Sequence, residues 1–237
     1  PMVCITGQVT RHLLGTDAFQ ETDVIGITMP ITKWNYQVTR AAEIPAVLAK
    51  AFYLANSGKP GPVLVDITKN AQIEMMEWTG YEPCTSVRGY NPLPKVDLIA
   101  IQKAADLINQ AKRPMILSGH GVLIAAAEEA LKAVAEKAGI PVSTTFQGLG
   151  SFHPKHDLYV GIPGMHGNYG PNLLSDECDV VFAVGMRFDD RVTGDVTRYI
   201  QHAKVIHLEI DPSEINKVVK TEVGILADAK EGLEALL

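Results

Sequence analysis

The feature that most constrains the fold is an uninterrupted apolar run that ends abruptly in charge. Residues 180–186 are apolar or glycine, and Arg187-Phe-Asp-Asp-Arg-Val-Thr-Gly194 follows directly. A run without polar alternation is typical of a strand buried on both faces, in the middle of a parallel sheet. Ligands of such sheets bind beyond the carboxyl ends of the strands, and buried charges there must be paired or meet a ligand. The pattern predicts a ligand site, with a purely structural ion-pair network as the alternative.

The rest of the chain alternates between strand and helix patterns. We expect strands at 2–6, 63–67, 114–118, 141–145, 179–185, 204–210 and 223–226, and helices at 41–55, 96–111 and 123–138, after Pro212 and from Asp228. This order predicts an α/β fold with a doubly wound parallel sheet, preceded by a partial α/β domain. The stretch between them is rich in proline and glycine and predicts a linker. The expected domains are 1–75 and 94–237, with a linker at 76–93.

Composition excludes several classes of partner. A formal net charge of -6 gives no basic footprint for nucleic acid, and no segment approaches the roughly 20 apolar residues of a membrane span. The three cysteines are odd in number and widely spaced, which favours reduced thiols over a disulfide framework or a zinc site. We therefore expect a cytoplasmic protein without a metal site in this chain. Because the chain begins in a strand pattern and stops in a helical one, we also expect it to be part of something longer.

Two glycine-rich segments are candidates for contact with a nucleotide. Ser118-Gly-His-Gly121 lies between a strand and a helix, where small residues let the backbone approach a phosphate, or simply make a tight turn. The loop 161–170 contains glycines that permit close approach to a flat ligand, and Met165 and His166 are able to cover a ring face. His166 alone is more typical of a surface histidine.

Carboxylates follow two later strands. Glu209 is suited to accept hydrogen bonds from ribose hydroxyls, whereas Asp211 before Pro212 is better explained as a helix cap, and Asp228 repeats that pattern. The glycines do not form the full dinucleotide fingerprint. We therefore expect an extended nucleotide such as FAD, or a coenzyme-A-like molecule, rather than NAD.

Six blocks in order carry a resemblance to a known family. They are Ile5-Thr-Gly-Gln-Val9, Gly15-Thr-Asp-Ala-Phe-Gln-Glu-Thr22, Ser57-Gly-Lys-Pro-Gly-Pro-Val-Leu-Val-Asp66, Gly148-Leu-Gly150, Gly164-Met-His-Gly167 and Arg187 to Gly194. Over essentially its whole length the chain resembles the large, catalytic subunit of acetolactate synthase, also called acetohydroxyacid synthase. Members of this family have a pyrimidine-binding, a central FAD-carrying and a diphosphate-binding domain. The resemblance implies that 1–75 is the second half of the first domain and 94–237 the central domain.

The resemblance also implies a function. Members of the family are transferases that use thiamine diphosphate and magnesium. They decarboxylate pyruvate and condense the two-carbon remainder with pyruvate or 2-oxobutyrate, a step of branched-chain amino acid biosynthesis. FAD is expected to be structural, because the condensation involves no net oxidation. Implied partners are other large subunits, as a homodimer or tetramer, and a small regulatory subunit. The family's activating glutamate and magnesium motif are not in these residues, so we expect the chain alone to be inactive and to bind FAD weakly or not at all.

Site residues follow from the family motifs, position by position. Phe19 is implied to line the substrate pocket, Gln20 to lie near thiamine, and Lys69 and Arg191 to lie along the entrance. The implied cofactor-binding residues are Lys59, Gly119, His120, Gly121, Thr145, Phe146, Gly164, Met165, His166, Gly185, Arg187, Phe188, Asp189, Glu209, Ile210 and Asp228. The chain departs from the family pattern at Lys59, where arginine is usual, at His120 within a run of glycines, and at Gln147, where methionine is common.

Two other functions remain open from the sequence. One is a noncatalytic flavin- or nucleotide-binding module. The other is a different thiamine diphosphate enzyme of the same architecture, such as an oxalyl-CoA decarboxylase or a glyoxylate carboligase. The blocks 15–22 and 187–194 favour acetolactate synthase over the second.

Overall fold

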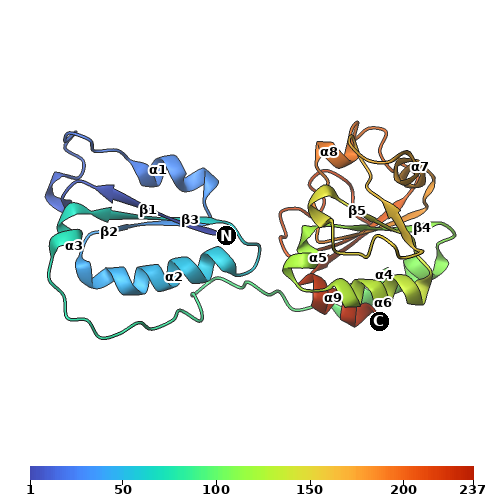
Figure 1. The fold of residues 1–237 in the computed structure, drawn as a ribbon, viewed down its shortest axis with the longest axis horizontal. Helices are drawn as coiled ribbons and strands as arrows, with labels where there is room; N and C mark the ends of the chain where they lie inside the picture. The colour runs from blue at the N-terminus through green and yellow to red at the C-terminus, as the bar shows by residue number, and fades with distance from the viewer. The chain divides into compact units, whose positions relative to one another are not determined.

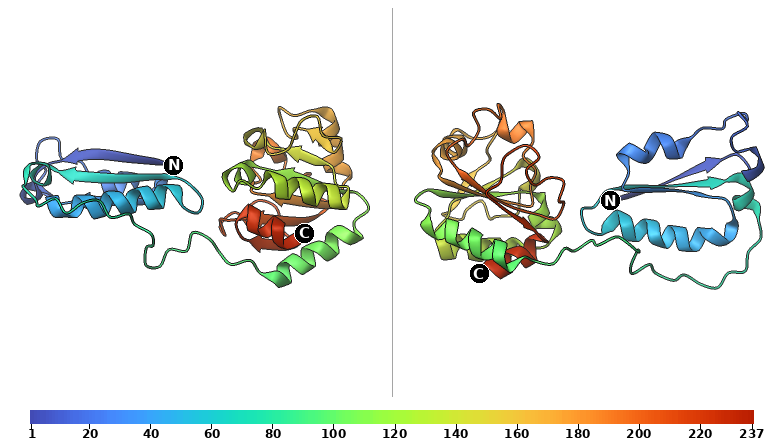
Figure 2. Two further views of the ribbon diagram at one scale, coloured as in Figure 1. Left: turned by 60° about the horizontal axis from the view of Figure 1, so that its bottom comes forward. Right: turned by 180° about the vertical axis from the view of Figure 1, so that it is seen from behind.

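The computed structural model describes all residues, 1–237. They form two compact units, 1–92 and 93–237, which are described separately. Figures 1 and 2 show the helices and strands of each unit. Residues 74–97 contain no helix or strand. None of the helices combines the length and the apolar composition needed to cross a membrane.

The first unit is a three-stranded parallel sheet in the order β1-β3-β2. Its strands are β1 (Met2–Gln8), β2 (Trp34–Val38) and β3 (Pro62–Thr68), and its helices are α1 (Val24–Thr28), α2 (Ile44–Asn56) and α3 (Lys69–Ile73). Short 3-10 helices span Arg11–Leu13, Met29–Ile31 and Ala41–Glu43. Figure 1 shows α2 on one face of the sheet and α1 on the other. Alternate β3 residues Val63, Val65 and Ile67 pack against α2 in one apolar cluster.

The second unit is a six-stranded sheet in the order β6-β5-β4-β7-β8-β9, parallel throughout. The strands are β4 (Pro114–Ser118), β5 (Val142–Thr144), β6 (Tyr159–Gly161), β7 (Val180–Val184), β8 (Lys204–Glu209) and β9 (Val223–Leu226). The helices are α4 (Leu98–Gln110), α5 (His120–Ile124), α6 (Glu128–Ala138), α7 (Tyr169–Glu177), α8 (Asp190–Thr193) and α9 (Ala229–Leu236), with a 3-10 helix at Phe146–Gly148. The predicted α/β fold with a parallel sheet is confirmed.

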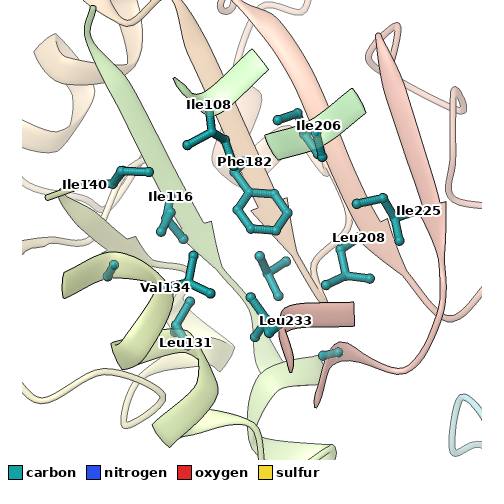
Figure 3. Packing of buried hydrophobic residues seen from close by; sticks show 14 of the residues in the cluster. Ile108, Ile116, Leu131, Val134, Ile140, Phe182, Ile206, Leu208, Ile225 and Leu233 are labelled. Atoms are coloured by element: carbon teal, nitrogen blue, oxygen red, sulfur yellow. The ribbon is translucent and has the colours of Figure 1, made fainter. Parts of the chain in front are cut away.

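Helices cover both faces of this sheet. Figure 1 shows α4, α6 and α9 on one face and α7 and α8 on the other. The strand β7 explains why both faces are needed, because Val180, Phe182 and Val184 enter one apolar cluster while Val181 and Ala183 enter the other. Figure 3 shows Phe182 in the first cluster, among aliphatic side chains from neighbouring strands and helices. All five β7 residues are buried, which confirms the central, doubly covered strand.

Several elements differ from the sequence expectations. The helix expected at 123–138 is two helices, because Ala126 has a φ of +49° and the Ala127 N–H donates to the Val122 carbonyl instead of continuing the first helix. No helix follows Pro212; the Asp211 carboxylate accepts the Ser213 N–H at 3.0 Å and so caps a turn. The short strands β2 and β6 and the helices α1, α3 and α7 were not expected. Cys178 is 2% exposed and lies in the core.

Candidate functional site

The candidate site of the second unit begins between β4 and β7. From β4 the chain proceeds to β5 and β6 on one side, and then returns to place β7, β8 and β9 on the other. The loops that leave the carboxyl ends of β4 and β7 therefore diverge. In open parallel sheets this divergence creates the crevice in which ligands bind. The sequence predicted a ligand site at the strand ends in general, whereas the strand order identifies the ends of β4 and β7 as its centre.

Glycines allow the ends of β4 and β7 to approach each other. The Gly119 N–H donates to the Val184 carbonyl and the Gly121 N–H to the Gly185 carbonyl, both at 2.9 Å. A Cβ on Gly119 would lie 2.4 Å from the Gly185 carbonyl oxygen, and one on Gly121 would lie 2.6 Å from the Gly185 Cα. Only glycine fits at these positions without moving the backbone, and the approach leaves peptide groups rather than side chains at the floor of the crevice.

The end of β5 is joined to the same place. The Thr145 N–H donates to the Ser118 carbonyl at 2.9 Å, and the His120 Nδ1 lies 2.9 Å from the Gln147 carbonyl oxygen. Since a carbonyl can only accept, His120 carries its proton on Nδ1 in this contact. Phe146 is 72% exposed beside these groups. A large apolar ring left in solvent at a strand end is available to a flat ligand.

The glycine-rich loop and the segment after β7 contact each other directly. The Met165 N–H donates to the Arg191 carbonyl at 2.9 Å, and the Arg191 guanidinium lies 3.8 Å from the Met165 sulfur. A Cβ on Gly164 would lie 2.2 Å from the Arg191 carbonyl oxygen. His166 is exposed on the same loop. The two segments that the sequence singled out therefore lie together.

The residues after β7 divide between solvent and core. The Arg187 side chain is 69% exposed and its Nε lies 3.2 Å from the Asp189 carboxylate, which also accepts the Arg191 N–H and caps α8. An exposed pair of this kind contributes little to stability, so the cation remains available to an anion. Phe188 is only 4% exposed and packs in the core. A contact from Phe188 to a ligand is therefore limited to its backbone.

The ends of β8 and β9 complete this edge of the sheet. Glu209 is 7% exposed, and one of its carboxylate oxygens accepts the N–H groups of Ile210 and Asp211 at 3.0 and 3.3 Å. The Ala227 N–H donates to the Glu209 carbonyl at 3.1 Å, which brings the start of α9 next to it. Asp228 is the N-cap of α9 and accepts the Lys230 N–H at 2.9 Å. Helix capping therefore explains the carboxylate at this position without a ligand.

In the first unit, the predicted catalytic residues lie at the carboxyl ends of the strands. Lys69 follows β3 and is exposed. Phe19 and Gln20 belong to the loop after β1, which the Gln8 side-chain amide holds through a 2.7 Å bond to the Thr22 carbonyl. Phe19 is 89% exposed and Gln20 has a φ of +63°. Lys59 lies before β3, at the opposite end of that strand.

Two residues that hold these loops were not expected. Asn172 accepts the Gly164 N–H at 2.7 Å and donates to the Gly164 carbonyl at 3.1 Å, fixing the glycine-rich loop. Glu21 accepts N–H groups from its own loop. Glu21 lies inside the block 15–22, but its role carries no sequence signal of its own, and neither does that of Asn172, because hydrogen bonds across a loop leave no periodicity.

A separate surface cleft of about 1150 Å³ lies between α2 and the segment after α3. It is lined by residues such as Arg40, Lys50 and Met75, and by none of the predicted site residues.

The edge of the second unit combines four kinds of group. It offers bare backbone at Gly119 and Gly121, a solvent-facing cation at Arg187, a nearly buried carboxylate at Glu209, and exposed apolar groups at Phe146 and Met165. Phosphates are recognised by cations and can approach glycine backbone closely, ribose is recognised by carboxylates, and flat rings by apolar faces. This set of groups fits an extended nucleotide that carries an aromatic ring, such as FAD.

Comparisons with known proteins show the family of the chain. Residues 101–236 match the central domain of thiamine pyrophosphate enzymes. All of the chain aligns with an acetolactate synthase large subunit of Corynebacterium glutamicum, at 49% identity over 237 residues and 38% of that protein. All of it also aligns with a probable acetolactate synthase large subunit of Methanocaldococcus jannaschii, at 45% identity and 40% of that protein, and with an acetolactate synthase of Mycobacterium bovis, at 45% identity and 38%. The chain thus spans about two fifths of the length of these relatives.

Proposed function

Because the chain belongs to the thiamine pyrophosphate enzyme family through its central domain, we propose that it is part of an acetolactate synthase. The proposed reaction is the decarboxylation of pyruvate and the condensation of the two-carbon remainder with pyruvate or 2-oxobutyrate. Its products would enter branched-chain amino acid biosynthesis. The observation that carries this proposal is the alignment of the whole chain, at 49% identity, with a relative named as an acetolactate synthase large subunit.

FAD is the proposed ligand of the second unit. The absence of side chains at Gly119 and Gly121 would let the diphosphate approach the backbone closely, and the exposed guanidinium of Arg187 would neutralise part of its charge. Glu209 would accept hydrogen bonds from ribose hydroxyls, and Met165 and Phe146 would cover ring faces. The remaining positions proposed from the family pattern belong to the second unit, except Lys59, which precedes β3 in the first unit. The condensation needs no redox step, so these residues would bind and orient rather than transfer electrons.

The first unit is proposed to carry residues of the substrate pocket. Thiamine diphosphate, with magnesium, supplies the electron sink for the decarboxylation. The Phe19 ring is exposed and would form an apolar wall that excludes water from the substrate, while the Gln20 amide would orient polar groups beside it. The exposed ammonium group of Lys69 would attract the carboxylate of an entering 2-oxo acid.

Partner subunits and a cytoplasmic location are also proposed. Relatives are named as large subunits, which supports a smaller partner subunit and association between large subunits. The three cysteines are free thiols, which supports a reducing compartment such as the cytoplasm.

The experiment that tests the proposal is an assay of acetolactate formation. The full-length protein that carries these residues is supplied with pyruvate, thiamine diphosphate, magnesium and FAD, and the product is measured with and without 2-oxobutyrate. We expect acetolactate in the first case and a mixture with 2-aceto-2-hydroxybutyrate in the second. Tight flavin binding with reversible one-electron chemistry, but no condensation, would instead support a noncatalytic flavin module.

Gly121→Ala tests the flavin site separately. The added Cβ would lie 2.6 Å from the Gly185 Cα and would force the ends of β4 and β7 apart. We expect FAD to bind roughly tenfold more weakly or worse, measured by flavin fluorescence titration of the full-length protein. Gly170→Ala is the matched control, since a Cβ there meets nothing within 4 Å. Equal affinity in the two variants, with both folded, would place the flavin elsewhere.

A further inference from the structure

The loop that carries Phe19 and Gln20 is closed by one carboxylate. The two oxygens of Glu21 accept the backbone N–H of Gly15, through a short bond, and that of Ala18 at 3.0 Å. The Glu21 N–H in turn donates to the Ala18 carbonyl at 2.9 Å. The side chain therefore fastens both the start and the middle of the loop to its end.

This loop needs such a fastening because its backbone is unfavourable. Gly15, Asp17 and Gln20 have φ values of +78°, +56° and +63°. Non-glycine residues in the left-handed region cost of order 1 kcal/mol or more, and they persist only where surrounding contacts determine the conformation. The Phe19 ring is 89% exposed and provides no packing of its own. Hydrogen bonds must therefore hold the loop.

The far end of the loop is attached to the sheet. The Gln8 side-chain amide donates to the Thr22 carbonyl at 2.7 Å and lies 3.4 Å from the Asp66 carboxylate. Asp66 is fully buried in β3 and also accepts hydrogen bonds from Thr6 at 2.7 Å and Gln37 at 3.0 Å. Hydrogen bonds to the sheet thus fix the position of Thr22. The neighbouring Glu21 side chain then connects the rest of the loop to this fixed point.

The charge of Glu21 matches this arrangement. Hydrogen bonds from the backbone N–H of Gly15, and then of Ala18, lower the pKa of Glu21 from its ordinary value of 4.5. Peptide N–H groups of Thr16 and Asp17 act in the same direction, against a small effect of burial. The carboxylate is therefore ionised at neutral pH, which gives the charge-assisted form of these hydrogen bonds.

We propose that Glu21 is a positioning residue that sets the course of the 15–22 loop and thereby places Phe19 and Gln20 in the substrate pocket. This inference rests on the proposed function, which assigns those two residues to the substrate pocket. Glu21 itself touches the loop backbone and not the substrate. Its loss should loosen the wall of the pocket while the sheet remains folded.

The test compares Glu21→Gln and Glu21→Ala in the full-length protein by hydrogen–deuterium exchange. Alanine removes both acceptors, whereas the glutamine amide keeps one oxygen and turns an N–H group toward the other donor. We expect exchange in residues 15–22 to be roughly tenfold faster or more in Glu21→Ala, and less accelerated in Glu21→Gln, with β1 and β3 unchanged. Glu136→Gln is the control, because Glu136 is also a carboxylate with a lowered pKa, owing to its hydrogen bond with His156 in the second unit.

Kinetics of acetolactate formation complete the test. A displaced Phe19 and Gln20 should raise KM for pyruvate several-fold with a smaller effect on kcat, in the same order as the exchange rates. Unchanged exchange in the loop, or faster exchange with an unaltered KM, overturns the inference. If the wild-type protein forms no acetolactate, the proposed function is wrong, while the exchange rates still decide whether Glu21 holds the loop.

Discussion

At the scale of single residues, His207 shows how a buried polar group shapes the candidate site. It lies within β8, 1% exposed, and its Nε2 donates to the Met186 carbonyl at 2.8 Å. The Phe188 ring packs against it with centroids 5.2 Å apart. His207 therefore fixes the backbone on both sides of Arg187, although Arg187 itself points into solvent. Nothing in the apolar pattern of the strand indicated this role.

Burial also makes His207 sensitive to acid. Desolvation lowers the pKa of His207 below its ordinary value of 6.5, so the neutral form is the one that folds. The stability that depends on neutral His207 is fully present above pH 6.5. It is lost as the pH falls from 6.5 toward the lower pKa that His207 has in the folded protein.

We expect His207→Gln, whose amide can still donate but does not titrate, to lose less stability between neutral pH and about pH 5 than the wild type. The difference has an upper limit of about 1.4 kcal/mol per pH unit for one proton. Urea unfolding at the two pH values measures it, with the exposed His202→Gln as control. Parallel pH profiles for wild type and His207→Gln would contradict the assignment.

At the scale of elements, helix caps separate structural from ligand-binding carboxylates. Asp228 caps α9, and Asp97 caps α4 by accepting the Ile99 N–H at 2.9 Å. Both helices pack on the same face of the six-stranded sheet. Asp228 belongs to the family-derived cofactor set, whereas Asp97 does not. Asp97 is therefore a control for Asp228, because it caps a comparable helix but is not predicted to contact the cofactor.

Replacing each capping residue distinguishes helix capping from contact with FAD. We expect Asp228→Ala and Asp97→Ala each to lower the free energy of unfolding by about 1 kcal/mol, through loss of the cap. Asp228→Asn should restore most of that stability. If Asp228 also contacts the nucleotide, only its variants should weaken FAD binding, measured by fluorescence titration beside the unfolding curves. Equal FAD affinity in all four proteins would leave Asp228 a helix cap.

At the scale of the whole molecule, the chain is two units with separate cores. The first unit has its own apolar cluster around β3 and α2, and the second has one cluster on each face of its sheet. The residues between α3 and α4 contribute no helix or strand. Each unit therefore has the internal contacts that a domain requires.

Limited proteolysis should divide the chain between the units. Arg88 and Lys95 are exposed and lie in the segment without regular structure. We expect trypsin to cleave there first and to leave two resistant fragments, which mass spectrometry identifies by their new ends. A variant with Arg88→Gln and Lys95→Gln should be cleaved more slowly. Earlier cleavage at Lys103 or Lys137, inside helices of the second unit, would contradict the division into two stable units.

The accuracy of the sequence-based expectations differed between elements for physical reasons. The strand β7 was predictable because burial on both faces requires an unbroken apolar run. The strand β6 has only three residues, too few for any periodicity. The strand β2 does alternate apolar and polar residues, which is typical of a half-buried strand, so its signal was present but overlooked. The interruption near Ala126 was not predictable, because the apolar pattern continues through it. The site residues themselves remain proposals.

The sequence by itself determined that the second unit is a parallel α/β sheet, and that glycines and charges follow its strands. Apolar runs and their alternation with helices are local properties, and local properties are legible in a sequence. Only the tertiary structure decided that β4 pairs with β7, which puts Gly121 against Gly185 and the glycine-rich loop against Arg191. Strand order depends on contacts between residues far apart in the chain, and no periodicity records those contacts.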